Sequence, residues 1–244
     1  MSIIFKTYLT PSIPREIFII MAKYLERHCN IMVDLQFELT SSGPKKGTKL
    51  EEDLSFMCSP PLYWLYDEYK DDIELIPVAP IFDDIRNKDE PVYFSDVLVK
   101  NNRSINSLDD IIGKTWSYND TESLSGYFCI KKYMRHLNLV CSGSHLNSLD
   151  YIRDNKADVT CIDSNALLFV NHDFKKIHTF GPHPIQPCII KKSCKYKNEI
   201  IDAFKKINDD KEVINEFNKY KILRFGTVNE NFFFKKYSIK HLVN

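Results

Sequence analysis

The strongest constraint in this sequence is an alternation of short strand-like and longer helix-like segments along most of its 244 residues. Four runs in the first part share β-branched, aromatic and other apolar residues and predict strands: residues 3–9, 32–39, 54–58 and 73–81. Helical spacing of apolar side chains predicts one helix that begins at Pro14 and another over residues 62–69. Repeated units of this kind predict α/β layers with mostly parallel sheets.

A second block repeats the alternation. Its predicted strands are residues 92–99, 115–118, 139–141, 157–162, 176–180 and 185–191. Its predicted helices begin near residues 106, 126, 144, 163 and 196. The segment 181–184 (Gly-Pro-His-Pro) predicts a loop, and the pattern after residue 225 leaves strand and helix both open.

The two blocks predict a two-lobed α/β protein with a cleft between the lobes. Residues 1–94 together with 187–244 are expected to form the first lobe, and residues 95–186 the second. Ligands of such folds bind beyond the carboxyl ends of strands, against helix N-termini. The loops that follow the strands are therefore the expected place of a binding site.

Charge and cysteine content narrow the class of function. Lys+Arg and Asp+Glu both number 33, so the formal net charge is zero, which excludes a nucleic-acid binder held by bulk electrostatics. No apolar run approaches about 18 residues, so no membrane span is expected. The seven cysteines are scattered without a CxxC pair, and the N-terminus lacks the features of a secretory signal. We expect reduced thiols and a cytoplasmic location.

The loop of residues 118–127 (YNDTESLSGY) follows one predicted strand and precedes a helix. Ser123 and Ser125 offer hydroxyl groups, and the free N–H groups of Leu124, Ser125 and Gly126 are expected to point at an anion. Gly126 also lets a ligand approach without meeting a Cβ. The alternative is that one of the serines only caps the helix.

Three further loops offer polar side chains. His145 lies in the first turn of a predicted helix, where it would donate to an oxyanion or serve as a surface or capping histidine. Asp163 follows a buried strand and would receive an ammonium group or cap the next helix. Ser59 would face the cleft from the first lobe.

Catalytic and metal-binding signatures are absent from the sequence. There is no P-loop and no GxSxG, HExxH or GxGxxG motif. His172, His178 and His183 are loosely grouped but lack metal-ligand spacing. We expect no catalytic residue, no metal ion and no cofactor.

Taken in order, these loops resemble the type 2 periplasmic-binding-protein fold, and most closely the phosphonate-binding branch of ABC-transporter solute receptors. The matching segments lie between residues 50 and 205: 53–60, 93–113, 123–127 (SLSGY), 143–145 (GSH), 157–159 and 162–164. The resemblance implies two lobes that close over a small ligand. It also implies that Ser123, Ser125, Gly126 and His145 hold an oxyanion.

The resemblance assigns two more positions, and this chain departs from the family pattern in two ways. Asp163 would meet an amine or another polar group of the ligand, and Tyr93 would line the cleft. Leu124 stands where the family usually has a small hydroxyl residue, so one contact to the anion is lost. A missing export signal also separates this chain from the family pattern.

We therefore expect non-catalytic binding of a small anion of the phosphonate, phosphate or phosphate-ester type. One alternative is an enzyme on the same scaffold, similar to the thiamine-pyrimidine-forming enzymes, whose cysteine-rich motif this chain lacks. The other is a protein-interaction or sensing module in which Leu124 and its neighbours fill the cleft. Convergence of Ser123, Ser125, His145 and Asp163 on one pocket would favour binding; ligand identity, oligomeric state and any protein partner stay open.

Overall fold

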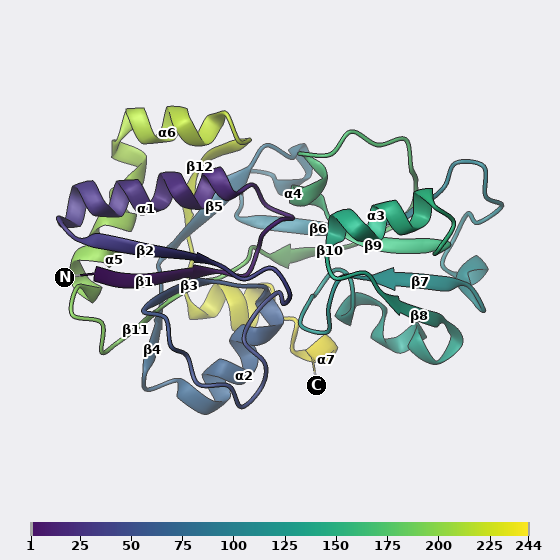
Figure 1. Ribbon diagram of the computed structural model, residues 1–244, viewed down its shortest axis with the longest axis horizontal. Helices are drawn as coiled ribbons and strands as arrows, with labels where there is room; N and C mark the ends of the chain where they lie inside the picture. The colour runs from purple at the N-terminus through teal and green to yellow at the C-terminus, as the bar shows by residue number, and fades with distance from the viewer. Residues whose placement is uncertain (1, 244) are drawn as a thin grey trace.

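The chain builds two five-stranded sheets that lie side by side, each with helices packed on it (Figure 1). The computed structural model describes residues 2–243. The strand order is β2-β1-β3-β11-β4 in the first sheet and β10-β6-β9-β7-β8 in the second. A two-stranded ladder of β5 and β12 completes the first lobe. The predicted two-lobed α/β class is confirmed.

The first lobe draws its elements from both ends of the chain (Figure 1). Its strands are β1 (Ser2–Thr7), β2 (Met32–Phe37), β3 (Leu54–Phe56), β4 (Ile73–Leu75), β5 (Val78–Phe82), β11 (Cys188–Lys191) and β12 (Ile222–Thr227). Its α-helices are α1 (Arg15–Cys29), α2 (Ser59–Tyr69), α5 (Lys197–Lys205) and α6 (Lys211–Asn218). Shorter turns of helix are η1 (Ile85–Asn87), η4 (Ile207–Asp209) and the π-helical η5 (Phe232–Lys236), and α7 (Lys240–Val243) follows.

The second lobe is one continuous part of the chain. Its strands are β6 (Val92–Val99), β7 (Thr115–Tyr118), β8 (Asn138–Cys141), β9 (Val159–Asp163) and β10 (Lys175–Pro184). Its helices are α3 (His145–Arg153), the single turn α4 (Ser164–Leu167) and the 3₁₀ helices η2 (Asp109–Ile111) and η3 (Phe128–His136). The predicted lobe boundaries at 94/95 and 186/187 stay predictions.

The core of the first lobe forms where α1 packs on its sheet. The helix begins directly after Pro14, whose φ of −55° suits a helix start, and ends at Asn30 in a left-handed conformation. One face of α1 is buried, and its Phe18 meets Phe5 of β1 and Phe56 of β3 with ring centroids 5.7–6.5 Å apart. Three aromatic rings thus join the helix to the centre of the sheet.

The sheets are mixed rather than mostly parallel, which corrects the expectation. In the first sheet β1 pairs in parallel with β2 and β3, but β11 runs antiparallel to β3 and β4. In the second sheet β7 pairs in parallel with β8 and β9, but β6 runs antiparallel to β9 and β10. The antiparallel pairs involve β6, which carries the chain into the second lobe, β10, which carries it out, and β11, which follows the return crossing. The crossing between the lobes sets the direction of these strands.

Two predicted boundaries near prolines were wrong. The predicted strand 73–81 is two strands, β4 and β5, which belong to different sheets because the chain turns at Pro77. The predicted loop 181–184 is instead the end of β10, with a register shift between Phe180 and His183. Gly181 takes a φ of +115° at this bulge, a conformation that side chains disfavour.

Two helix predictions in the second lobe differ from the structure in helix type or length. The predicted helix 126–137 is the 3₁₀ helix η3, and the predicted helix after residue 163 is the single turn α4. The ambiguous tail after residue 225 completes β12 and continues through η5 and α7. Tertiary packing decides the structure of the tail, because its Ile239 is 2% exposed although its neighbours in sequence are polar.

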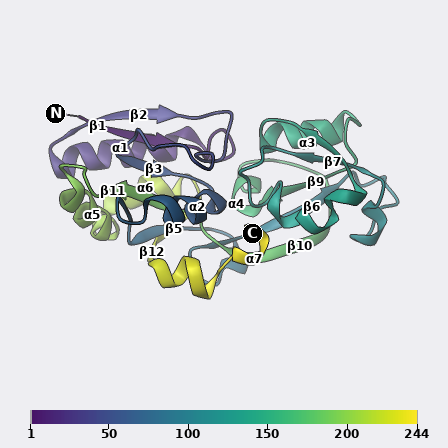
Figure 2. The same ribbon diagram turned by 90° about the horizontal axis from the view of Figure 1, so that it is seen from below.

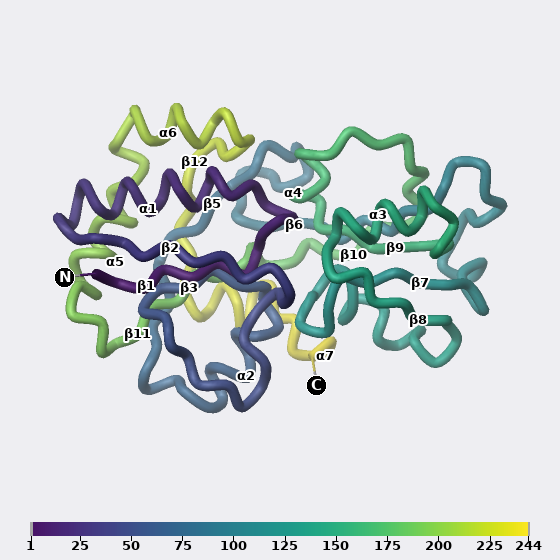
Figure 3. Tube along the Cα trace, viewed as in Figure 1, coloured from purple at the N-terminus to yellow at the C-terminus, as the bar shows by residue number. Residues whose placement is uncertain are grey.

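The chain enters and leaves the second lobe at one place. Strands β6 and β10 form an antiparallel ladder from Val99 and Lys175 at one end to Val92 and Pro184 at the other. The trace in Figure 3 follows this pair between the lobes. Figure 2 shows α7 at the junction of the two lobes, in agreement with its contacts to α2 and η3. Within residues 2–243, no helix is long and apolar enough to cross a membrane.

Replacing Phe5 with alanine is expected to lower the free energy of unfolding by about 3–5 kcal/mol, because the fully buried ring leaves a cavity between Phe18 and Phe56. Urea unfolding followed by circular dichroism measures the change. The matched control is Ile85→Ala, which removes apolar atoms from a side chain that is 95% exposed and should change stability by less than about 0.5 kcal/mol. Equal effects of the two variants would contradict this account of the core.

Candidate functional site

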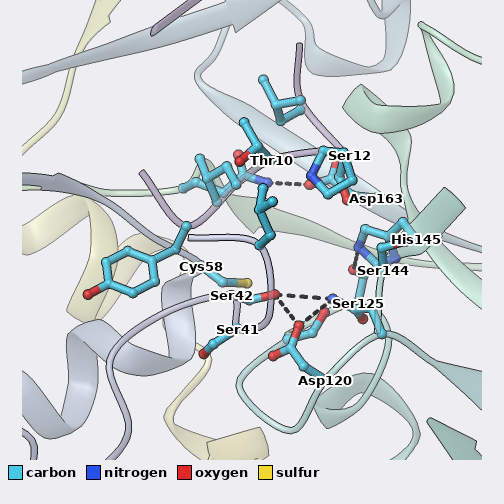
Figure 4. A pocket seen from close by; sticks show the side chains of 18 of the residues that line it. Thr10, Ser12, Ser41, Ser42, Cys58, Asp120, Ser125, Ser144, His145 and Asp163 are labelled. Atoms are coloured by element: carbon cyan, nitrogen blue, oxygen red, sulfur yellow. Dashed lines mark hydrogen bonds between the residues drawn. The ribbon is translucent and has the colours of Figure 1, made fainter. Parts of the chain in front are cut away.

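A polar cavity lies between the two lobes and is lined by loops from both (Figure 4). Its free volume is about 30 Å³, room for about two water molecules, so the lobes are closed on each other. The lining residues are Tyr8, Leu9, Thr10, Pro11, Ser12, Ile13, Leu39, Ser41, Ser42, Cys58, Asn119, Asp120, Ser123, Ser125, Gly143, Ser144, His145, Asp163 and Gln186. A ligand larger than water requires the lobes to part.

Strand ends position the lining residues. The loops that follow β1, β2 and β3 supply the wall from the first lobe, and those that follow β7 and β8 supply much of the opposite wall. Asp163 is the last residue of β9, and Gln186 lies where the chain crosses back after β10. Parallel strands bring their carboxyl ends to one edge of a sheet, so each sheet offers several loops to the same cavity.

Four of the predicted site residues, Ser123, Ser125, His145 and Asp163, line this one cavity. The hydroxyl of Ser125 lies 3.1 Å from Nε2 of His145, and both side chains are buried. Burial lowers the pKa of His145 to about 4, so its imidazole is neutral at pH 7. Nδ1 of His145 has no hydrogen-bond partner among the described residues. The pair therefore keeps hydrogen-bonding capacity for a ligand.

The structure corrects one expectation about backbone donors. The N–H of Leu124 donates to Sγ of Cys58 at 3.3 Å, and the N–H of Gly126 donates to Oγ of Ser123 at 3.2 Å. Two of the three N–H groups expected to face an anion therefore already have partners in the protein. The loop folds into a tight turn before η3 begins at Phe128, and that turn uses these groups.

Two residues of the same loop were predicted as contacts but do not line the cavity. The side chain of Leu124 is fully buried in an apolar cluster with Cys58, Tyr93, Cys129 and Ile239, so it does not fill the cleft. Gly126 lies against Asn119, where an added Cβ would come within 2.1 Å of Oδ1. Its role in the structure is therefore to allow a close approach within the protein.

Tyr93 and Ser59 also lie outside the cavity lining. Tyr93 is fully buried in the cluster around Leu124, and its ring lies 5.3 Å from that of His183. Ser59 is the first residue of α2, and its hydroxyl donates to the carbonyl of Pro184 at 3.2 Å. Ser59 therefore bonds the first lobe to the end of β10, and Tyr93 packs β6 against residues of both lobes.

Asp163 serves as a helix cap and lines the cavity at once. Its Oδ1 accepts from the N–H of Asn165 at 2.8 Å at the start of α4, and its Oδ2 accepts from the side-chain amide of Gln186. Burial raises its pKa to about 7, against the opposing effect of these hydrogen bonds. Ser144 likewise caps α3 by accepting from the N–H of Asn147 at 3.1 Å.

Asp120 and Ser42 are lining residues that sequence reasoning missed. Oδ1 of Asp120 accepts from the N–H of Glu122 at 2.9 Å, and Oδ2 accepts from Nδ2 of Asn119 at 2.7 Å and from the hydroxyl of Ser42. The last bond joins the two lobes. Burial raises the pKa of Asp120 to about 6. An aspartate that accepts from the N–H two residues later is a turn signal that can be recognised in the sequence, and Asp120 fits it. Ser42, by contrast, lies 78 residues from Asp120, so no local pattern connects the two.

The cavity offers hydroxyl, amide and imidazole groups but no permanent positive charge. Its lining includes neither lysine nor arginine, and its carboxyl groups are those of Asp120 and Asp163. Burial raises the pKa of Cys58 far above neutrality, so that thiol stays protonated. Within residues 2–243, no group of three His, Cys, Asp or Glu side chains could hold a metal ion.

Replacing Asp163 with asparagine is expected to change how stability depends on pH. Because burial raises its pKa from 3.8 to about 7, the folded state retains a proton that the unfolded chain has lost. The stabilisation from this proton is fully present below the unfolded pKa and is lost as the pH rises through the folded pKa. The free energy of unfolding of the wild type minus that of Asp163→Asn should therefore fall over this window, by at most about 4 kcal/mol.

Urea titrations of both proteins between about pH 4 and pH 8 measure this difference. His145 and His183, whose pKa values burial lowers to about 4, act in the opposite direction. Both proteins retain these histidines, so their contribution cancels. A difference that stays constant with pH would show that Asp163 is not perturbed by burial.

Solved structures share this fold. A binding protein component of an ABC phosphonate transporter from Pseudomonas aeruginosa aligns with a TM-score of 0.78 at 16% identity, over 94% of this chain and 82% of that one. PhnD1 from Prochlorococcus marinus, in complex with methylphosphonate, gives 0.73 at 11%, over 96% and 95%. A Xanthomonas citri protein bound to ATP gives 0.68 at 12%, over 94% and 92%. At these identities the similarity shows the fold alone.

The sequence itself matches a protein family. The family is described as the periplasmic substrate-binding protein of phosphonate ABC transporters, and the match extends over residues 10–231. No curated protein matches the sequence. The matched residues include both crossings between the lobes and all residues that line the cavity except Tyr8 and Leu9. The chain therefore belongs to the family of phosphonate-binding periplasmic substrate-binding proteins of ABC transporters.

Proposed function

We propose that this protein binds a small oxyanion of the phosphonate, phosphate or phosphate-ester type between its lobes and does not transform it. The observation that carries the proposal is the convergence of Ser123, Ser125, His145 and Asp163 on one cavity. These side chains come from three separate loops of the second lobe and face a wall supplied by the first lobe. A ligand held there contacts both lobes and so stabilises the closed arrangement.

The hydrogen-bonding groups suit an oxyanion without a cationic side chain. Ser123 supplies a hydroxyl group, and the hydrogen-bonded pair of Ser125 and the neutral His145 supplies one further donor. That donor is the O–H of Ser125 when Nε2 of His145 carries the proton, and Nδ1–H of His145 when Ser125 donates to Nε2. Hydrogen bonds to an ionised oxygen are about twice as strong as those between neutral groups. Exclusion of water from the buried cavity strengthens them further.

The ligands of solved relatives support this class. The Prochlorococcus marinus protein holds methylphosphonate, and the Xanthomonas citri protein holds ATP, which carries phosphoryl groups. In this chain, Asp163 adds a carboxyl group to the lining. An amine on the ligand would favour the ionised form of Asp163 and lower its pKa, so an amine-bearing phosphonate fits better than one with a second anionic group.

We also propose that the protein works in a reducing compartment such as the cytoplasm. Seven free cysteines support this, and five of them, including Cys58 and Cys161, are buried. Fractionation of cells that produce the native chain tests the proposal. Recovery in an exported fraction would overturn it, while leaving ligand binding in place.

Addition of methylphosphonate, 2-aminoethylphosphonate, inorganic phosphate or a phosphate ester is expected to stabilise the protein in at least one case. At a free concentration 100 times Kd, a ligand that binds only the folded state raises the free energy of unfolding by about 2.7 kcal/mol. Ser125→Ala should weaken binding about 10-fold, because it removes a donor from a buried site. Urea unfolding with and without ligand measures the first effect, and isothermal titration calorimetry measures the second.

The matched control is Ser104→Ala, which removes an exposed hydroxyl of the second lobe that does not line the cavity. Its affinity should equal that of the wild type. Failure of all four ligands to bind the wild type would contradict the proposed function. Equal affinity of Ser125→Ala and wild type would instead remove Ser125 from the site.

A further inference from the structure

We propose that Asp120 determines which oxyanions the cavity accepts, by admitting ligands that bring a proton to its carboxylate and rejecting those that are fully ionised. The inference rests on the proposed function and deepens it. Its physical basis is a second buried carboxyl group, in addition to Asp163, in a cavity that is expected to receive an anion.

Three hydrogen bonds hold the Asp120 carboxylate in place. The N–H of Glu122 donates to Oδ1, and Nδ2 of Asn119 donates to Oδ2. The hydroxyl of Ser42 also donates to Oδ2 (Figure 4). The side chain is 8% exposed, so it has little freedom to turn away when a ligand enters. Each carboxylate oxygen can accept two hydrogen bonds, so Oδ1 still has an unused acceptor position.

No positive side chain lines the cavity to offset the charge of Asp120. The charged or titratable groups near it are Glu122, Tyr118 and Cys58 and, elsewhere in the cavity lining, Tyr8, Asp163 and the neutral His145. Glu122 adds to the negative potential at Asp120. An ionised ligand oxygen next to this carboxylate is therefore repelled in a site with little water to screen the charges.

A protonated ligand oxygen reverses the sign of this contact. It donates an O–H···O⁻ hydrogen bond to Asp120, which is among the shorter and stronger hydrogen bonds in proteins. Phosphoryl and phosphonyl groups retain an oxygen that titrates near neutrality, at about pH 6 for a phosphate monoester. A sulfonate has the same tetrahedral shape but no oxygen that titrates in this range. Asp120 is therefore expected to separate phosphonates from sulfonates.

The test compares methylphosphonate with methanesulfonate by isothermal titration calorimetry at neutral pH. Because the pKa of Asp120 is about 6, the carboxylate can take up a proton beside an ionised ligand at pH 7 at about a 10-fold cost, so the wild type should bind methylphosphonate about 10-fold more tightly than methanesulfonate. Asp120→Asn keeps the shape of the side chain but removes its charge, so methanesulfonate should bind more tightly and the ratio should fall about 10-fold. The control is Asp109→Asn, which removes the same charge from an exposed residue of the second lobe outside the cavity lining and should leave the ratio unchanged.

The outcomes separate the inference from the proposed function. Binding of methylphosphonate by the wild type with equal affinity for methanesulfonate overturns the inference and leaves the function in place. An unchanged affinity ratio in the Asp120→Asn variant, whose folding is verified by circular dichroism, also overturns the inference and leaves the function in place. Failure of the wild type to bind any phosphonate or phosphate overturns both. Where the Asp120→Asn variant does not fold, equal affinity of the wild type for the two ligands still overturns the inference.

Discussion

The antiparallel ladder between β6 and β10 is the constraint on which the rest of the structure depends. It ties Val92 to Pro184, so the chain enters and leaves the second lobe at the same point. Directly beyond it, the N–H of Ile185 donates to the carbonyl of Pro91 at 2.9 Å, and Gln186 bonds Asp163. The chain then returns as β11 between β3 and β4. This crossing fixes the edge at which the loops of both sheets face each other and hence the position of the cavity.

Closure of the cavity rests on a small number of contacts between the lobes. Ser42 bonds Asp120, and the N–H of Leu124 bonds Cys58. Behind these bonds, the apolar cluster around Leu124 includes Ile239 of the C-terminal tail, so residues from both lobes and the tail share one buried surface. Each hydrogen bond contributes only about 0.5–1.5 kcal/mol net. A ligand that supplies comparable bonds can therefore replace them when the lobes part and close again.

The fold and half of the site could be predicted from local patterns. Ser123, Ser125, His145 and Asp163 were recognisable because each follows a predicted strand, and strand ends gather at one edge of a sheet. Leu124, Gly126 and Ser59 were placed in the site for the same reason, and Tyr93 through the family resemblance, yet all four face the protein interior. Position in a loop does not determine the direction of a side chain, because that direction depends on which neighbours from the other lobe pack against it.

The sequence by itself determined the α/β class, most strand positions and the loops that carry polar groups, since hydrophobic periodicity and turn residues act over a few neighbours. Only the tertiary structure decided the mixed direction of the sheets, the continuation of β10 through Gly181 and Pro182, and the presence of Asp120 opposite Ser42. These features join segments many residues apart. They depend on the crossing between the lobes and on the requirement that buried polar groups find partners, which no local pattern records.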